Sequence, residues 1–595
     1  MLKKFFINTL SSFVGAWIAL LLVGVVGCIV LFGFIGRLAL SQSPEQVKSR
    51  SVLKIELAGP IEEYRMEERP DPRDIITGNF SSVQTLDVLI EGIRLAADND
   101  NIAAIYLDCG NVQAAPATLN ALREAISDFR KSGKKVLAYG DELSMGAYFV
   151  ASAADSVFLN PGGSISLSGL GSTSMYMKDL FDKLGIEFQV VKVGSFKSAV
   201  EPYIMQEMSA RARAQLDTLY TNMWGYIRDN IAKSRKGVTA TGIDSLINIE
   251  NISFAPTSLA KKSGLVDNLI YGRNMKSRLA SLVGAEEDKL NFVSPSTLVN
   301  QTDWANSFSG KDRIAVLYAV GEIADGADRG INYENLVPLI VQLADDKDVK
   351  GMVLRVNSPG GSAFGSEQIG EALDYFRSKG KPLAVSMGDY AASGGYWISS
   401  CADIIFADPL TITVSIGIFG LIPNFSGTMN KLGVSPQTVT TNPSANFPTG
   451  IRPMDARQLE VMQAYVDRGY EQFVSRVAKG RRKSVEAVKR IGEGRVWDAM
   501  MAQRIGLVDS LGSMSKAIEW TARKAGISNK YNLGAYPQFS PGIWSFISEN
   551  GLADGLVSSL DEDHFRKFAS EYVKTILARK PIQARMPEIS VGFGL

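Results

Sequence analysis

Two stretches of this 595-residue chain, one near residue 140 and one near residue 388, are copies of each other. The first reads GDELSMGAYFVASAADSVFLNP and the second reads GDYAASGGYWISSCADIIFADP. At an offset of 248 they share Asp141/Asp389, Gly146/Gly394, Tyr148/Tyr396, Asp155/Asp403, Phe158/Phe406, Pro161/Pro409 and, further on, Gly169/Gly417. A unit of this length is a whole domain, so the chain is a tandem duplication and not a solenoid of short repeats.

The similarity extends to both sides of these stretches. Upstream, NIAAIYLDCG (101–110) aligns with DVKGMVLRVN (348–357), and downstream GLVD (264–267) matches GLVD (506–509). We therefore expect a first copy over residues 47–300 and a second copy over residues 301–535. A tail, 536–595, has no counterpart within the repeat and is left unassigned.

Each copy alternates strand and helix patterns. In copy two, apolar strands are expected at 314–321, 351–357 and 382–387, with amphipathic helices at 334–346 and 367–380 between them. The strand VLKIELAG (52–59) opens copy one in the same way. This alternation predicts an α/β fold with parallel strands and helices over the sheet, and places ligand sites at the carboxyl ends of the strands.

The N-terminus predicts a membrane anchor. Residues 13–36 (FVGAWIALLLVGVVGCIVLFGFIG) are almost wholly apolar, which is long enough to cross a bilayer and longer than a signal-peptide core. We expect residues 1–46 to be a cytoplasmic N-terminus and an uncleaved transmembrane helix; a removed signal peptide or a buried helix are the alternatives. Lys3 and Lys4 favour a cytoplasmic start, so we expect the bulk of the chain outside the cytoplasm, which in a double-membrane bacterium is the periplasm.

Composition excludes several function classes. A net charge of +1 without a basic patch gives no reason to bind nucleic acid. The short basic run 479–483 is expected to be a solvated turn. Three separated cysteines make neither a disulfide framework nor a zinc site, and Cys109 and Cys401 are expected to be buried thiols. The single histidine, His564, lies in the polar tail, so a Ser-His-Asp hydrolase is nearly excluded.

Ser393 is the candidate nucleophile. It follows a predicted strand, precedes Gly394 and Gly395, and opens a helix, where free N–H groups stabilise an oxyanion. A helix-capping serine is the simpler reading of this position. The SPGGS turn (358–362) strengthens the catalytic reading, because Gly360 or Gly361 could supply a second oxyanion donor beside Gly394. By itself this turn is equally well a plain tight turn.

A serine nucleophile needs a base, and Lys197 is the candidate. It lies in an apolar setting, VKVGSFKSAVEPY, where burial can lower the pKa of a lysine toward neutrality. Met145 occupies the copy-one position of Ser393, and Lys197 aligns near Ala445 in copy two. Each copy thus retains the group that the other lacks, which suggests one active site shared between the two copies.

Four segments carry a resemblance to a known family: GSFKSAVEPY, RVNSPGGS, DYAASGGYWISS and TVSIGIFG. Together they resemble the signal peptide peptidase A (protease IV) family in its long, two-copy form. The resemblance implies tandem Clp-protease/crotonase-like superhelical domains behind the membrane helix. It also implies a Ser-Lys dyad of Ser393 (nucleophile) and Lys197 (general base), with Ser415 orienting the lysine.

From this resemblance we expect a membrane-anchored serine endopeptidase of the bacterial inner membrane. Its substrates would be cleaved signal peptides and other hydrophobic peptides, its assembly a homotetramer, and its lipid contact the N-terminal helix. No metal or organic cofactor is needed for this chemistry. Two alternatives stay open: a crotonase-like acyl-transfer enzyme and a catalytically dead membrane scaffold. The first is disfavoured because no suitable pair of acidic residues lies beside SPGGS.

Overall fold

The computed structural model describes residues 47–64, 84–301, 311–326, 330–442, 444–445, 447, 449–528, 531–537, 582–586 and 589. The predicted anchor, residues 13–36, and His564 lie outside the described residues. Among the residues that are described, no helix has both the length and the apolar character needed to cross a membrane.

Copy one is built on a sheet in which every pairing is parallel. Its order is β2-β1-β3-β4-β5-β7, with β8 also beside β1. The strands are β1 (Ser51–Glu62), β2 (Gln84–Thr85), β3 (Ile102–Gln113), β4 (Lys135–Leu143), β5 (Ser156–Ile165), β7 (Asn268–Leu269) and β8 (Phe292–Val293). The helices are α3 (Leu86–Asp98), α4 (Pro116–Phe129), α5 (Met145–Ala151), α6 (Lys178–Leu184), α7 (Glu201–Ile204), α8 (Ala210–Ser234), α9 (Ala240–Asn248), α10 (Thr257–Lys262), α11 (Arg273–Val283) and α12 (Pro295–Asn300).

Copy two repeats this plan in the order β18-β16-β14-β12-β9-β20. Its strands are β9 (Arg313–Val320), β12 (Val349–Ser358), β14 (Leu383–Ala392), β15 (Ile404–Ala407), β16 (Ile412–Val414), β18 (Val496–Asp498), β19 (Ser510–Leu511) and β20 (Asn532–Tyr536). The helices are α13 (Tyr333–Asp345), α14 (Ala363–Ser378), α15 (Gly394–Ser399), α16 (Ser426–Lys431), α17 (Ala456–Gly480), α18 (Val485–Ile491), α19 (Ala499–Arg504) and α20 (Met514–Lys524). Only β18, among the strands of this path, pairs antiparallel.

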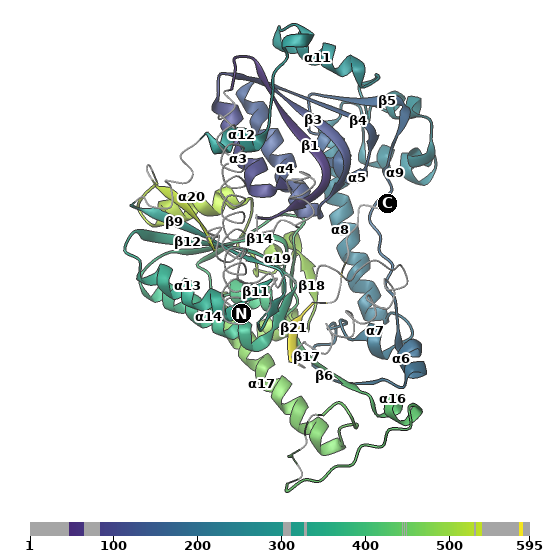
Figure 1. The fold of residues 1–595 in the computed structure, drawn as a ribbon, viewed down its shortest axis with the longest axis vertical. Helices are drawn as coiled ribbons and strands as arrows, with labels where there is room; N and C mark the ends of the chain where they lie inside the picture. The colour runs from purple at the N-terminus through teal and green to yellow at the C-terminus, as the bar shows by residue number, and fades with distance from the viewer. Residues whose placement is uncertain are drawn as a thin grey trace, which may run out of the picture.

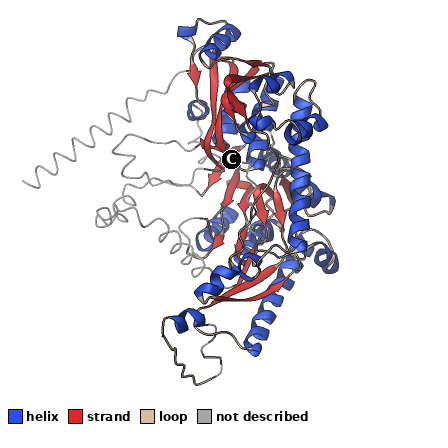
Figure 2. Cartoon of the chain, turned by 90° about the vertical axis from the view of Figure 1, so that its right-hand side faces the viewer, coloured by secondary structure: helices blue, strands red, loops and turns tan. Residues whose placement is uncertain are grey.

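The two copies lie one above the other along the long axis (Figure 1). Strands form the interior of both copies, and helices lie around them (Figure 2). The long helix α8 leaves copy one and runs alongside copy two, where α6, α7 and β6 (Glu187–Val193) follow one another in space (Figure 1). Copy one therefore extends across copy two through the segment from α6 to α8, which we call the arm.

A third sheet joins the copies. Its order is β11-β10-β13-β21-β17-β6, made of β10 (Ile323–Ala324), β11 (Ile331–Asn332), β13 (Gly360–Ser362), β17 (Ile418–Asn424), β21 (Ile582–Arg585) and β6. All of these strands belong to copy two or to the tail except β6, which pairs antiparallel with β17 along its whole length. The arm of copy one is thereby fixed in register against copy two.

The duplication extends to individual hydrogen bonds. Tyr148 donates to the Leu265 carbonyl at 2.8 Å, and its counterpart Tyr396 donates to the Leu507 carbonyl at 2.7 Å. In both copies the aspartate of GLVD accepts a backbone N–H bond from the strand that precedes it in the sheet. The repeat found in the sequence is therefore also a repeat of the interactions that hold each helix to its sheet.

Buried polar contacts hold the copies together. Arg355 of copy two forms an ion pair with Glu63 of copy one at 2.6 Å, with both side chains less than 9% exposed. Thr118 Oγ1 donates to Asp389 at 2.7 Å, and Asn120 donates to Asp408 at 2.8 Å. Because these groups are removed from water, their partners across the interface are required for stability.

Most expected elements are confirmed within a few residues, but two expectations need correction. AFGSE (363–367) begins helix α14, capped by Ser362, so this helix starts four residues earlier than expected. The basic run 479–483 is not simply a solvated turn: the Arg481 side chain is only 4% exposed and pairs with Asp509 at 2.5 Å. Arg235 and Asp267 form the same pair in copy one at 2.6 Å, so this contact belongs to the duplicated core.

Candidate active site

Ser393 lies where strand β14 ends and helix α15 begins. The serine is fully buried, and its backbone has φ 55° and ψ −113°. Its hydroxyl makes no capping hydrogen bond to the helix. The reading of Ser393 as an ordinary helix-capping serine is therefore wrong, and its hydroxyl is available for another partner.

That partner is Lys197. Its Nζ lies 2.8 Å from Ser393 Oγ and 3.1 Å from Ser415 Oγ, and it also donates to the Ser415 carbonyl at 3.2 Å. The lysine follows β6, and the pairing of β6 with β17 carries it from copy one into copy two. The structure thus brings the three residues Ser393, Lys197 and Ser415 together within one chain.

The surroundings of the lysine disfavour its charged form. Lys197 is fully buried, and loss of solvation lowers the pKa of its amine well below the ordinary lysine value. It forms no ion pair among the described residues to offset this effect. A neutral amine within hydrogen-bonding distance of a hydroxyl can accept its proton, which is how serine nucleophiles are activated.

Backbone strain is concentrated beside the dyad. Val414 has φ 75° and Ser415 has φ 53°, conformations that L-residues, and β-branched ones above all, rarely adopt. The Ser393 N–H donates to the Val414 carbonyl at 2.7 Å, which links this strained pair to the strained serine. Each such residue costs about 1–3 kcal/mol, so the surrounding structure must hold them in place.

A glycine turn at residues 492–494, which the sequence alone did not single out, packs against Lys197 and Ser415. Gly494 donates to the Ile416 carbonyl at 2.7 Å, and its own carbonyl accepts from Ser415 Oγ at 3.2 Å. A Cβ at Gly494 would come within 2.7 Å of Lys197 Cβ, and the φ of 75° also requires glycine. The run Gly492-Glu493-Gly494 was the available signal for this tight approach.

The glycine turn of SPGGS faces Ser393. Gly360 and Gly361 have φ 102° and 149°, and a Cβ on Gly360 would lie 2.7 Å from the Gly394 nitrogen. The Gly360 N–H donates to Ser358 Oγ at 3.2 Å, which leaves Gly361 and Gly394 as the better candidate oxyanion donors. The expected site residues therefore meet at the carboxyl ends of β12 and β14. Ala445, aligned with Lys197, is exposed on a separate segment.

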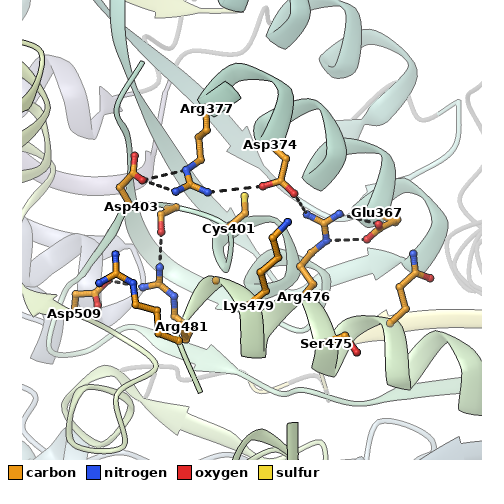
Figure 3. A pocket seen from close by; sticks show the side chains of 14 residues that line it. Glu367, Asp374, Arg377, Cys401, Asp403, Ser475, Arg476, Lys479, Arg481 and Asp509 are labelled. Atoms are coloured by element: carbon orange, nitrogen blue, oxygen red, sulfur yellow. Dashed lines mark hydrogen bonds and ion pairs between the residues drawn. The ribbon is translucent and has the colours of Figure 1, made fainter. Parts of the chain in front are cut away.

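A polar pocket lies between α14 and α17, and none of the candidate site residues lines it (Figure 3). Several of its charged side chains pair with one another: Arg377 pairs with Asp403 at 2.6 Å, and Arg476 pairs with Glu367 at 2.8 Å. Cys401 lies at its base as a buried free thiol, as does Cys109 in copy one, which confirms that expectation. The pocket is lined by an ion-pair network and is not part of the dyad site.

Fold and site together define a class: two-copy α/β proteins in which a buried lysine of one copy contacts a serine at a helix start of the other. Comparison with known proteins agrees. The model of "Peptidase family S49" matches residues 128–286 and 375–528, one segment in each copy. The chain belongs to peptidase family S49 and is a serine peptidase.

The chain is similar to Protease 4 of Haemophilus influenzae, at 34% identity over 86% of this chain and 83% of that protein. It is also similar to Protease 4 of Salmonella typhi, at 33% identity over 78% and 75%, and to a chloroplastic serine protease SPPA of Arabidopsis thaliana, at 27% identity over 81% and 70%. These similarities span both copies, so the duplicated architecture is shared. Family membership also decides against the acyl-transfer and scaffold alternatives.

Proposed function

We propose that this serine peptidase uses a dyad of Ser393 as nucleophile and Lys197 as general base, with Ser415 orienting the lysine. The single observation that carries the proposal is the 2.8 Å separation of Lys197 Nζ from Ser393 Oγ in a fully buried setting. Burial lowers the pKa of the amine and so favours its neutral form, and only a neutral amine can accept the serine proton.

The reaction then follows from the geometry. Lys197 takes the proton of Ser393 as its oxygen attacks the peptide carbonyl, and the N–H groups of Gly394 and Gly361 stabilise the oxyanion. The protonated Lys197 gives its proton to the leaving amine, and water hydrolyses the acyl-enzyme. Loss of one oxyanion donor typically costs about 2.7–4 kcal/mol, so the glycine turn matters as well as the dyad.

We further propose that the substrates are cleaved signal peptides and other hydrophobic peptides at the membrane. The similarity to a putative signal peptide peptidase SppA of Enterococcus faecium, 30% identical over 43% of this chain and 69% of that protein, supports this substrate class. The apolar run at 13–36 supports a single-pass anchor in the bacterial inner membrane, with the bulk of the chain on the periplasmic side. We also propose that the protein assembles as a homotetramer and that its two copies span residues 47–300 and 301–535.

The test uses the full-length protein in lipid vesicles with a quenched fluorescent peptide of signal-peptide sequence. We expect cleavage by the wild type and none by Ser393→Ala or Lys197→Ala, with all three equally folded by circular dichroism. Near-normal turnover by Lys197→Ala would contradict the dyad. A wild type that cleaves polar peptides as fast as apolar ones would contradict the substrate class alone.

A further inference from the structure

The tail, which has no counterpart in the repeat, returns to the proposed active site. Strand β21 (Ile582–Arg585) lies between β13, the glycine turn, and β17, and it pairs antiparallel with both. Figure 1 shows it in yellow beside β17. Nothing in the duplicated fold calls for a strand at this place.

β21 fills a slot that is one strand wide. Without it, β13 and β17 would face each other as two open edges, two strand spacings or about 9–10 Å apart. An extended peptide that enters such a slot gains backbone hydrogen bonds on both sides. The slot passes Gly360 and Gly394, the neighbour of Ser393, so an extended substrate of that serine would lie in it.

The register places one carbonyl at the candidate oxyanion hole. Gly361 lies opposite Ala584, and Met586 N–H donates to the Pro359 carbonyl at 3.0 Å. Hydrogen-bonded pairs alternate along an antiparallel ladder, so the pair two residues further on, Gly361 and Ala584, is again a hydrogen-bonding one. A Cβ on Gly360 would overlap the Ala584 carbonyl oxygen, and a Cβ on Gly394 would lie 3.2 Å from it.

The residues on both sides of the Ala584 carbonyl make specific contacts with the two copies. Ala584 is fully buried in the core of copy two, while Met586 and Ile589 are buried against copy one. Arg585 forms an ion pair with Glu322 at 3.6 Å, and Tyr390 donates to the Ile589 carbonyl at 3.1 Å. These contacts hold the described residues of the tail, 582–586 and 589, in place at this slot.

We propose that residues 582–586 are an intramolecular occupant of the substrate slot, with Ala584 at the position of the residue whose carbonyl is attacked. The tail competes with substrates and keeps the resting enzyme closed. This inference rests on the proposed function, because it takes Ser393 and the glycine turn as the site that is covered.

The expected effect follows from competition. If the slot is free for one-tenth of the time, the apparent affinity for substrate is lowered about tenfold, and removing the tail recovers it. We therefore compare the wild type with a chain ending at residue 580 and with full-length Ala584→Glu. A glutamate cannot be buried beside Gly360 without a partner, so this substitution expels β21 while the chain keeps its length. Ala445→Glu, on an exposed segment, is the matched control for added charge.

The readouts are KM and kcat for the quenched peptide and the rate of fluorophosphonate labelling of Ser393. Both tail variants should lower KM and speed labelling about tenfold, and Ala445→Glu should do neither. A synthetic peptide of residues 581–589, added to the truncated chain, should inhibit it and restore the wild-type KM. Should truncation impair folding, Ala584→Glu still provides the test, with the peptide added to that variant instead.

Mass spectrometry of the intact chains gives an independent outcome. Loss of residues 585–595 from the wild type but not from Ser393→Ala would mean that the tail is read as a substrate, which supports the proposal. Unchanged KM and labelling in Ala584→Glu, together with no inhibition by the peptide, would overturn it. If instead Ser393→Ala retained full activity, the proposed dyad itself would fail, whatever the tail variants did.

Discussion

The same strand-to-helix turn occurs twice in this molecule, once relaxed and once strained. In copy one, Ser144 has φ −60° and its hydroxyl accepts the Ala147 N–H at 3.3 Å, while the buried Met145 stands at the nucleophile position. In copy two, Ser393, which aligns with Met145, has φ 55° and no capping bond, whereas Met145 is not among the residues with a positive φ. The fold can therefore form this turn without strain, so the strain at Ser393 is specific to the copy that carries the nucleophile.

The strand ends differ in the same way. In copy two they are covered by β21, whereas in copy one the corresponding ends, with Gly110, Gln113 and Ser144, line an open cavity in the described part of the chain. Copy one contributes its lysine to the site in copy two, because Lys197 follows strand β6 of the arm and β6 pairs with β17. The two copies thus contribute different parts of the candidate site: copy one the lysine, and copy two the serines and the glycine turn.

Exchanging the two serines for alanine tests this comparison with the largest expected effect. Ser393→Ala should lower kcat/KM by about 10⁴–10⁶-fold, because removing a serine nucleophile leaves only binding and oxyanion stabilisation. Ser144→Ala should leave kcat/KM unchanged and cost about 1 kcal/mol of stability through the lost cap. Comparable loss of activity in both variants would mean that the copies are functionally equivalent.

Separating the copies has the next largest effect. Arg355→Met leaves Glu63 buried without its partner, which should lower the free energy of unfolding by about 3–5 kcal/mol. Activity should fall as well, since this contact helps to hold copy one against copy two. Arg94→Met, which breaks an exposed helix pair with Glu91, should cost no more than about 0.5 kcal/mol. Denaturant unfolding measures both values, and equal costs would argue against a buried interface that depends on this pair.

Ser415→Ala sharpens the role of the third residue. We expect kcat to fall about 10–100-fold with little change in KM, because the lysine loses the hydroxyl that orients it while the slot remains intact. Steady-state kinetics with the quenched peptide separates the two constants. A rise in KM at constant kcat would assign Ser415 to substrate binding instead.

The smallest effect is expected for Lys197→Met, which should raise the stability of the fold, whereas Ser144→Ala and Arg355→Met should lower it. Burial lowers the pKa of Lys197 in the folded chain, whereas an unfolded lysine titrates near about 10.4. Between these two values the unfolded chain binds more protons, so stability rises with pH across this window and is penalised below it. Lys197→Met should therefore abolish activity yet raise the unfolding midpoint, by about 2–4 °C for each kcal/mol recovered. Calorimetry should show this gain shrinking as the pH approaches about 10, and a destabilised variant at neutral pH would contradict the burial penalty.

The sequence was sufficient to predict the duplication, the parallel α/β sheets and the meeting of Ser393 with Lys197. The first two predictions rest on local patterns and on the comparison of two copies, and the third rests also on the resemblance to a known family. It could not reveal β21, because four residues of an unassigned tail carry no periodicity and gain their strand from partners more than 160 positions away. The burial of Arg481 was missed for a related reason: its partner Asp509 is distant in sequence, although the Arg235–Asp267 pair in copy one repeats it.

The most direct test of the shared site is the pH dependence of fluorophosphonate labelling at Ser393, mapped by mass spectrometry. In the wild type the labelling rate should fall as the pH drops through the lowered pKa of Lys197, because protonation removes the base. Lys197→Ala should label at least about 100-fold more slowly, without that titration. Equal labelling of the two proteins across the pH range would show that the lysine of copy one does not activate the serine of copy two.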